Sequence, residues 1–249
     1  MSTFLTLTKK ILEAPRIDFG VLFNESVTVF KKVWLQGFIL QLISIGLSLP
    51  LLIFNFGFLL DSGIDTNSYE SLEQLMNGDA MVEHLGSLVI LYYLLAIVIG
   101  LMTSLLTFGF FRVIRKMDQG ANFQISDFFY FFKINRIKKS IVLILANFGI
   151  AIIAILMCVL PLFYVMIPLM FVTPIFVYNQ ELSISEVLKS SFQLGHKKWG
   201  ITFVITLLNV ITLYILILLT CGIGSLFFSC FLQMPIYVLY KKIISFDGV

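Results

Sequence analysis

The residues that decide the fold are Ser140–Tyr178, SIVLILANFGIAIIAILMCVLPLFYVMIPLMFVTPIFVY, a run without a single charged side chain. As one straight helix these 39 residues would be about 58 Å long, at a rise of 1.5 Å per residue. The hydrocarbon core of a bilayer is only about 30 Å thick, and about 20 apolar residues cross it. The run must therefore fold back on itself, and Pro161, near its middle, is the natural place for the break.

Three further uncharged runs flank this one, at Val33–Leu60, Leu85–Phe111 and Gly200–Tyr240. The first two each fit one helix, and Pro50 would kink or tilt the first. The third is too long for one crossing and divides at Thr220–Gly224, where two glycines permit a tight turn. The sequence thus predicts six membrane-spanning helices, at about 35–60, 86–111, 140–160, 162–179, 200–220 and 225–241.

The composition favours an integral membrane protein. Of the 249 residues, 59% are hydrophobic and 12% are charged, whereas about 25% of residues in soluble domains are charged. So few charges cannot cover a water-facing surface, which excludes a soluble globular enzyme, a disordered chain and a disulfide scaffold. We interpret residues 1–249 as one all-α membrane domain, with a cytoplasmic segment at 1–34, a six-helix bundle at 35–241 and a cytoplasmic tail at 242–249.

The charges predict the topology. All 17 Lys and Arg residues fall in the segments 1–32, 112–139, 179–199 and 241–249, and the loop 61–84 holds six acidic residues but no Lys or Arg. Cytoplasmic segments of membrane proteins carry the excess of Lys and Arg. We therefore expect three helical hairpins in a bacterial inner membrane, with both termini in the cytoplasm.

Each of three cytoplasmic segments places apolar residues at helical spacing and then reaches a Lys-Lys pair: Asp18–Phe30, Ser126–Phe132 and Ser183–Phe192. Ser183 and Glu186 also form a capping-box pattern, which is typical of a helix start. We expect three amphipathic helices lying on the membrane surface. The cations at this edge are the expected contacts with anionic lipids: Lys31, Lys32, Arg112, Arg115, Lys116, Lys138, Lys139, Lys197 and Lys198.

No constellation typical of catalysis occurs in the sequence. The predicted spans contain no ionisable Asp, Glu, Lys, Arg or His, which weighs against a proton-coupled pump. The topology places His84 and His196 on opposite faces, so they cannot share a metal. We therefore expect no catalytic residue, no metal and no cofactor. The predicted partners are membrane lipids, with an unidentified membrane or cytoplasmic protein as a further candidate, and no nucleic acid.

Weakly polar residues recur on one face of several predicted spans. Such residues usually face neighbouring helices, where backbones approach closely and hydrogen bonds cross, and this favours a structural or accessory protein. The alternative is a polar-lined cavity that conducts a lipid or a small neutral molecule. Its lining residues would be Gln41, Asn147, Asn209 and Gln233. The sequence leaves both interpretations open.

Two stretches also carry a family resemblance. The first comprises Gly109–Arg112, Arg115, Lys116, Gly120 and Ser126–Phe129, and the second comprises Pro161, Leu162, Pro174, Glu181–Ser191, Trp199, Gly222–Gly224, Pro235 and Tyr240. Together they resemble the bacterial family typified by the membrane domain of glycerophosphodiester phosphodiesterases, which includes stand-alone relatives of unassigned role. The resemblance implies a six-helix membrane bundle and no catalysis, because the phosphodiesterase of the fused members is a separate soluble barrel. Leu162 departs from the family pattern, in which glycine follows the proline.

Overall fold

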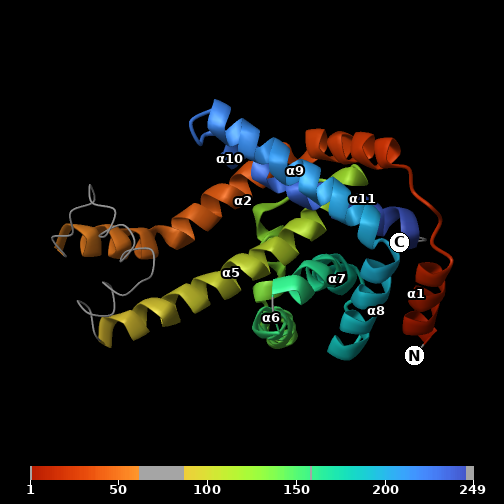
Figure 1. Cartoon of the computed structure of the whole chain (residues 1–249), viewed down its shortest axis with the longest axis horizontal. Helices are drawn as coiled ribbons and strands as arrows, with labels where there is room; N and C mark the ends of the chain where they lie inside the picture. Colours follow the sequence, from red (N-terminus) through yellow and green to blue (C-terminus); the bar gives the residue numbers. More distant parts are fainter. Residues whose placement is uncertain (1, 62–86, 158, 245–249) are drawn as a thin grey trace. The chain divides into compact units, whose positions relative to one another are not determined.

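The computed structural model describes residues 2–61, 87–157 and 159–244, which are helical and contain no β-strand (Figure 1). Six helices in this part of the chain are long and apolar enough to cross a membrane. They are Phe19–Gly57, Val89–Asp118, Ile134–Leu156, Pro161–Tyr178, Trp199–Leu219 and Gly224–Ile244. The prediction of an all-helical protein with six candidate spans is therefore confirmed. Most of the acidic loop predicted at 61–84 lies outside the described residues.

The described residues form the following helices. In chain order they are α1 Ser2–Leu12, α2 Phe19–Asp61, α5 Ser87–Asp118, the 3₁₀ helices η1 Ile125–Asp127 and η2 Tyr130–Phe132, α6 Ile134–Leu156, α7 Val159–Tyr178, α8 Ile184–Lys197, α9 Trp199–Leu219, α10 Gly224–Phe228, the 3₁₀ helix η3 Ser229–Gln233, and α11 Met234–Ile244. The chain divides into two compact units. Unit 1 comprises Met1–Gln41 and Leu105–Val249, and unit 2 comprises Leu42–Ser104.

Two of the three expected amphipathic helices differ from the prediction. The first is not separate, because α2 continues from Phe19 through Lys31 and Lys32 to Asp61 without a break. Lysine is a good helix former, so a Lys-Lys pair does not end a helix. The second, at 126–132, consists of two short 3₁₀ turns. There Phe128 and Phe131 are fully buried three residues apart, which is the spacing of a 3₁₀ helix.

The third amphipathic helix, α8, forms as its capping pattern predicts. The Ser183 N–H donates to Glu186 Oε2 at 2.8 Å, and the Glu186 N–H donates to Ser183 Oγ at 3.3 Å. These donors from the Ser183 backbone and hydroxyl hold the pKa of Glu186 below its ordinary value. Val187 and Leu194 are fully buried, and α8 lies along α7. The apolar face of α8 is thus covered by protein.

The long central run folds back close to the expected place. Helix α6 ends at Leu156 and α7 begins at Val159, so Pro161 lies in the first turn of α7 rather than at the break. Proline is tolerated in a first turn because the N–H group that it lacks would have no helical partner there. The start of α7 also contacts the start of α9, since Trp199 Nε1 donates to the carbonyl of Tyr164 at 3.1 Å. The predicted topology puts these two residues near opposite membrane faces, which a regular up-and-down bundle would keep apart.

The predicted turn at 220–224 is present. Cys221 has φ +50° and Gly222 has φ +92°, and the Gly222 N–H donates to the Ile217 carbonyl at 2.8 Å, as in a Schellman motif. The sixth span after this turn is not one α-helix, because the 3₁₀ helix η3 separates α10 from α11. Residues 234–240 are nevertheless all buried, and this span is the most buried of the six candidates.

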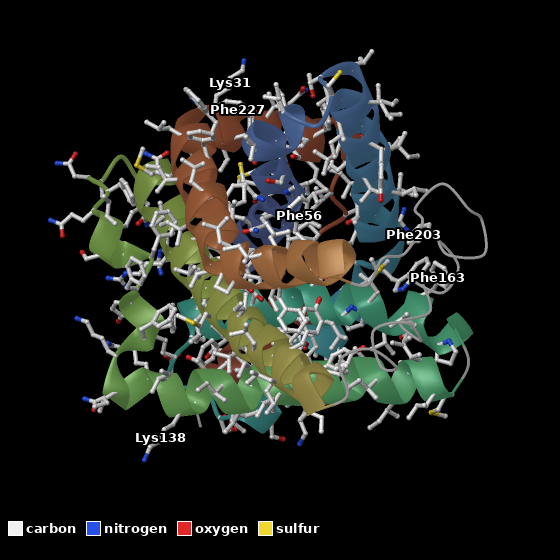
Figure 2. All side chains as sticks on the ribbon, turned by 90° about the vertical axis from the view of Figure 1, so that its left-hand side faces the viewer. Lys31, Phe56, Lys138, Phe163, Phe203 and Phe227 are labelled. Atoms are coloured by element: carbon white, nitrogen blue, oxygen red, sulfur yellow. The ribbon has the colours of Figure 1, made fainter. Side chains whose placement is uncertain are left out.

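Unit 1 is not a stack of parallel rods. Helix α6 is seen end-on in Figure 1, whereas α9 lies across the view. Figure 2, turned by 90°, shows α6 lengthwise, with Lys138 near one end of the α6–α7 pair and Phe163 near the other. The N-terminal α1, which the sequence analysis did not predict, packs against α8 and α11. It buries Leu7 and Ile11, and Lys10 Nζ donates to the Ile244 carbonyl at 2.8 Å.

Unit 2 is a pair of helical segments with mostly exposed apolar side chains. Phe54 of α2 and Tyr92 of α5 have ring centroids 5.2 Å apart. Asn55 Nδ2 donates to the Tyr92 hydroxyl at 3.2 Å. Ile53, Phe56 and other large apolar residues of this unit are more than half exposed. Such surfaces are expected of segments that face lipid hydrocarbon.

Candidate anion-binding pocket

The last turns of α5 place a cationic face beside the end of α7. Arg112, Arg115, Lys116 and Gln119 follow the spacing i, i+3, i+4 and i+7, which puts them on one side of the helix. With Val177 and Tyr178 they line a pocket of about 290 Å³. The buried residues Phe110, Val113 and Ile114 anchor the other side of α5 in unit 1. The sequence therefore folds so that the charges converge on a cavity.

Aromatic rings hold the guanidinium groups in place. The Arg112 guanidinium lies 3.9 Å from the ring centroid of Tyr130, and that of Arg136, from α6, lies 4.1 Å from the same centroid. Both distances are within the range of a cation–π interaction, so the Tyr130 ring attracts both guanidinium groups. Arg115 lies 5.6 Å from the ring centroid of Tyr178, which forms a wall of the pocket.

Asp127 is the counter-ion of two of the pocket cations, Arg112 and Lys116. Lys116 Nζ lies 2.6 Å from Asp127 Oδ1, and Arg112 Nε lies 3.6 Å from the same oxygen. The Gln124 N–H donates to Asp127 Oδ2 at 3.1 Å. Burial alone would raise the pKa of Asp127, but these donors and charges together hold it below its ordinary value of 3.8. The carboxylate is therefore ionised at neutral pH.

The charged side chains that line the pocket are all cationic. They are Arg112, Arg115 and Lys116, and two of them, Arg112 and Lys116, lie beside the Asp127 carboxylate. The carbonyl ends of α5 and α7 lie nearby and carry partial negative charge, so the side chains must supply the attraction for an anion. Arg112 Nε is buried and has no hydrogen-bond acceptor among the described residues. A phosphate group offers several oxygen acceptors for such donors.

The structure divides the nine predicted lipid contacts into three sets. Arg112, Arg115 and Lys116 line the pocket. Four others bind the protein itself: Lys32 pairs with Asp118 at 3.1 Å, Lys139 donates to the Gln180 carbonyl, Lys197 donates to the Leu12 carbonyl, and Lys198 donates to the Pro15 carbonyl. Lys31 and Lys138 are exposed. Burial, together with the charge of Lys197, lowers the pKa of Lys198.

The four amides predicted to line a cavity are buried or half-buried. Gln41 accepts a hydrogen bond from Ser229 at 3.2 Å. The buried atoms Asn147 Oδ1, Asn209 Nδ2 and Gln233 Oε1 have no hydrogen-bond partner among the described residues. Asn209 is only 3% exposed. A buried amide atom without a partner costs free energy, so these atoms are candidates for contact with a water or a solute.

Sequence reasoning missed Tyr178, which lines the pocket, and also Asp127 and Tyr130, which contact its cations. Asp127, Tyr130 and Tyr178 were not predicted as site residues, although Asp127 stands among the seven cations of segment 112–139. Its acidic charge in a basic segment was a usable signal for an ion pair. Tyr178 gave no such signal, because its contact with Arg115 depends on how α7 packs against α5.

The described residues contain no group of three or more His, Cys, Asp or Glu side chains that could hold a metal ion. Comparison of the chain with protein-family models, with curated proteins and with solved structures finds no match in any of the three. The resemblance to the membrane domain of glycerophosphodiester phosphodiesterases therefore stays a prediction.

Proposed function

We propose that the chain is a non-enzymatic integral membrane protein, a structural or accessory component of a bacterial inner membrane. We further propose that its pocket at the end of α5 binds the phosphate group of an anionic ligand. The observation that supports this most is the convergence of Arg112, Arg115 and Lys116 on a cavity of about 290 Å³. Arginine forks and a nearby ammonium are the usual protein partners of phosphate oxygens.

The place of the pocket favours a lipid headgroup as the source of the phosphate. Both α5 and α7 are candidate spans, and the pocket lies where they end, at Asp118 and Tyr178. The ends of membrane-spanning helices lie at the depth of lipid headgroups. The distribution of Lys and Arg supports an orientation with both termini, and this pocket, on the cytoplasmic side.

The binding test uses two double variants that remove the same charge from different places. The variant Arg115→Gln/Lys116→Gln removes two pocket cations, and Lys31→Gln/Lys138→Gln removes two exposed ones. Because a charge-assisted hydrogen bond contributes about 1.5–3 kcal/mol, the pocket variant should bind phosphate at least about tenfold more weakly. Native mass spectrometry with phosphatidic acid in nanodiscs measures the lipid arm, and ³¹P NMR with methyl phosphate in maltoside detergent measures the soluble arm.

Equal weakening by the two double variants would show a general surface attraction and contradict the pocket. Binding of phosphatidic acid without binding of methyl phosphate would identify the lipid as the ligand. Binding of methyl phosphate alone would identify a soluble phosphate compound.

A second candidate function, a conduit for a small neutral molecule, is favoured by the unpaired amide atoms of Asn147, Asn209 and Gln233. Asn209→Leu should then lower the entry of glycerol into liposomes several-fold. Thr212→Leu, at an exposed position one turn further along α9, should leave it unchanged. Glycerol entry no faster than in protein-free liposomes would exclude this function for glycerol-sized solutes.

A further inference from the structure

We propose that the α6–α7 pair lies along the cytoplasmic surface of the membrane instead of crossing it, so that α6 contacts lipid hydrocarbon while α8 faces water. This inference goes beyond the phosphate pocket and does not depend on phosphate binding. It concerns the exposed face of α6, for which it names the lipid bilayer as the partner. All three helices belong to unit 1, where α7 packs against both α6 and α8 and is seen between them in Figure 1.

Helix α8 runs back along α7 over most of its length. It begins six residues after Tyr178, and its last turn reaches the start of α7. There the Tyr164 hydroxyl lies 2.5 Å from His196 Nδ1, and Gly195 lies against the backbone of Pro168. The 14 residues of α8 extend over about 21 Å at 1.5 Å per residue. Helix α8 must therefore share whatever depth in the membrane α7 has.

The exposed face of α8 is too polar to lie inside the bilayer. Its exposed side chains include Lys189, Gln193, His196 and Lys197, which follow the spacing of one helical face. If α7 crossed the membrane from Tyr178, this face would reach about 21 Å into a hydrocarbon core of about 30 Å. Charged side chains are strongly disfavoured there. We therefore expect the whole length of α8, and with it α7, at the membrane–water interface.

The N-terminal helix supports the same depth for the far end of α8. Lys197 Nζ donates to the carbonyl of Leu12, the last residue of α1. On α1, the side chains of Lys9 and Glu13 beside it are 75% and 67% exposed. An α7 that crossed the membrane would place these charged groups of the N-terminal segment inside the bilayer as well.

The exposed face of α6 has the opposite character. Every exposed side chain of α6 after Lys139 is apolar, and these positions run from Val142 to Leu156. Lipid hydrocarbon fits such a face in a chain with six apolar candidate spans. The rings of Tyr164 and Trp199, which stack with centroids 6.5 Å apart, then lie at one interface, where Tyr and Trp are enriched. The three helices together are thus apolar on the α6 side and polar on the α8 side, as an interfacial helix is.

The charge distribution is compatible with this arrangement. Since α6, α7 and α8 all begin and end on one side, the segments 112–139 and 179–199 with their Lys and Arg residues stay cytoplasmic. The phosphate pocket keeps its depth too, because Tyr178 lies at the cytoplasmic surface whether or not α7 crosses the membrane.

The test measures the depth of nitroxide spin labels in the full-length protein, reconstituted into liposomes of phosphatidylcholine and phosphatidylglycerol. The labelled variants are Val142→Cys, Phe148→Cys and Leu156→Cys, each made with Cys158→Ser and Cys221→Ser. All three positions are more than half exposed, so a label there does not enter the protein core, and the remaining Cys230 is buried. The accessibility of each label to oxygen and to a nickel chelate, measured by EPR, gives its depth. The three α6 labels should lie at one depth in the hydrocarbon.

The matched control places labels on α9 over the same 14-residue distance, with Val204→Cys, Ile211→Cys and Leu218→Cys. These positions are also exposed. For a crossing helix, the label at Ile211 should lie about 10 Å deeper than the other two, since seven residues rise about 10 Å.

Three results on α6 would contradict the proposal. A label at Phe148 that lies deeper than those at Val142 and Leu156, as on α9, would show that α6 crosses the membrane. A steady change in depth from Val142 to Leu156 would show that α6 enters the bilayer at a steep angle. Strong access of the nickel chelate to all three labels would show that α6 does not contact lipid. None of these results would alter the phosphate pocket, whose own test is separate.

Discussion

Replacing Gly195 with alanine is expected to destabilise unit 1 by about 3 kcal/mol, because the new methyl group has no room. An ideal Cβ at Gly195 would lie 2.5 Å from the Cα of Pro168. The Pro168 Cα belongs to the backbone and cannot rotate away, so α8 and α7 would have to separate along their contact. Thermal unfolding in detergent, followed by far-UV circular dichroism, measures the loss.

The matched control lies five residues further along the chain. A Cβ at Gly200, in the first turn of α9, meets no atom within 4 Å. Since alanine favours a helix over glycine by up to about 1 kcal/mol, Gly200→Ala should leave the stability unchanged or raise it. If Gly195→Ala and Gly200→Ala unfold at the same temperature, the close approach of α8 to α7 is contradicted.

Asp118→Ala is expected to cost about 2 kcal/mol of stability, because a hydrogen bond to a charged group contributes about 1.5–3 kcal/mol. The Asp118 side chain is 6% exposed and binds three partners from two other helices. Lys32 of α2 lies 3.1 Å away, and Lys241 of α11 lies 2.5 Å away. The hydroxyl of Tyr237 donates to it at 3.0 Å. Without the carboxylate, α2, α5 and α11 lose their common contact.

Glu25→Ala is the control for this prediction, because it breaks an ion pair of similar length at a more exposed place. Glu25 is 43% exposed and lies 2.6 Å from Lys242. An exposed pair contributes about 1 kcal/mol or less. Equal losses for Asp118→Ala and Glu25→Ala in thermal unfolding would show that Asp118 does not hold the three helices together.

The six candidate spans could be predicted because their signals are local. An uncharged run of about 20 residues is readable from the sequence alone, and so is the Ser183–Glu186 cap that begins α8. The stretch at 126–132 could not be predicted in the same way. Its Phe residues fit a helical spacing, but two tertiary contacts determine the conformation of the segment. They are the ion pair between Asp127 and Lys116 and the close approach of the Phe128 backbone to Gly109. Both are contacts with α5.

The candidate site was predicted only as a set of cations. Nine Lys and Arg residues looked equivalent at the membrane edge, and three of them line the pocket while four bind the protein itself. Whether a given cation lines the pocket or binds the protein depends on which carbonyl or carboxylate oxygen the fold places beside its side chain. The contact of Tyr164 with Trp199 was missed for a related reason, because neither apolar runs nor loop charges show which helices pack together.

The burial of α11 has a consequence for biosynthesis. The span that contains it has the lowest mean hydropathy of the six candidates and the largest share of buried residues. It also comes last of the unit 1 helices, so the ribosome makes it after all its neighbours. After the earlier helices have inserted into the membrane, the interior of unit 1 is therefore still incomplete. It is filled only after residues 234–244 have been synthesised. A nascent chain halted before Met234 should expose that interior to proteases and insertion factors.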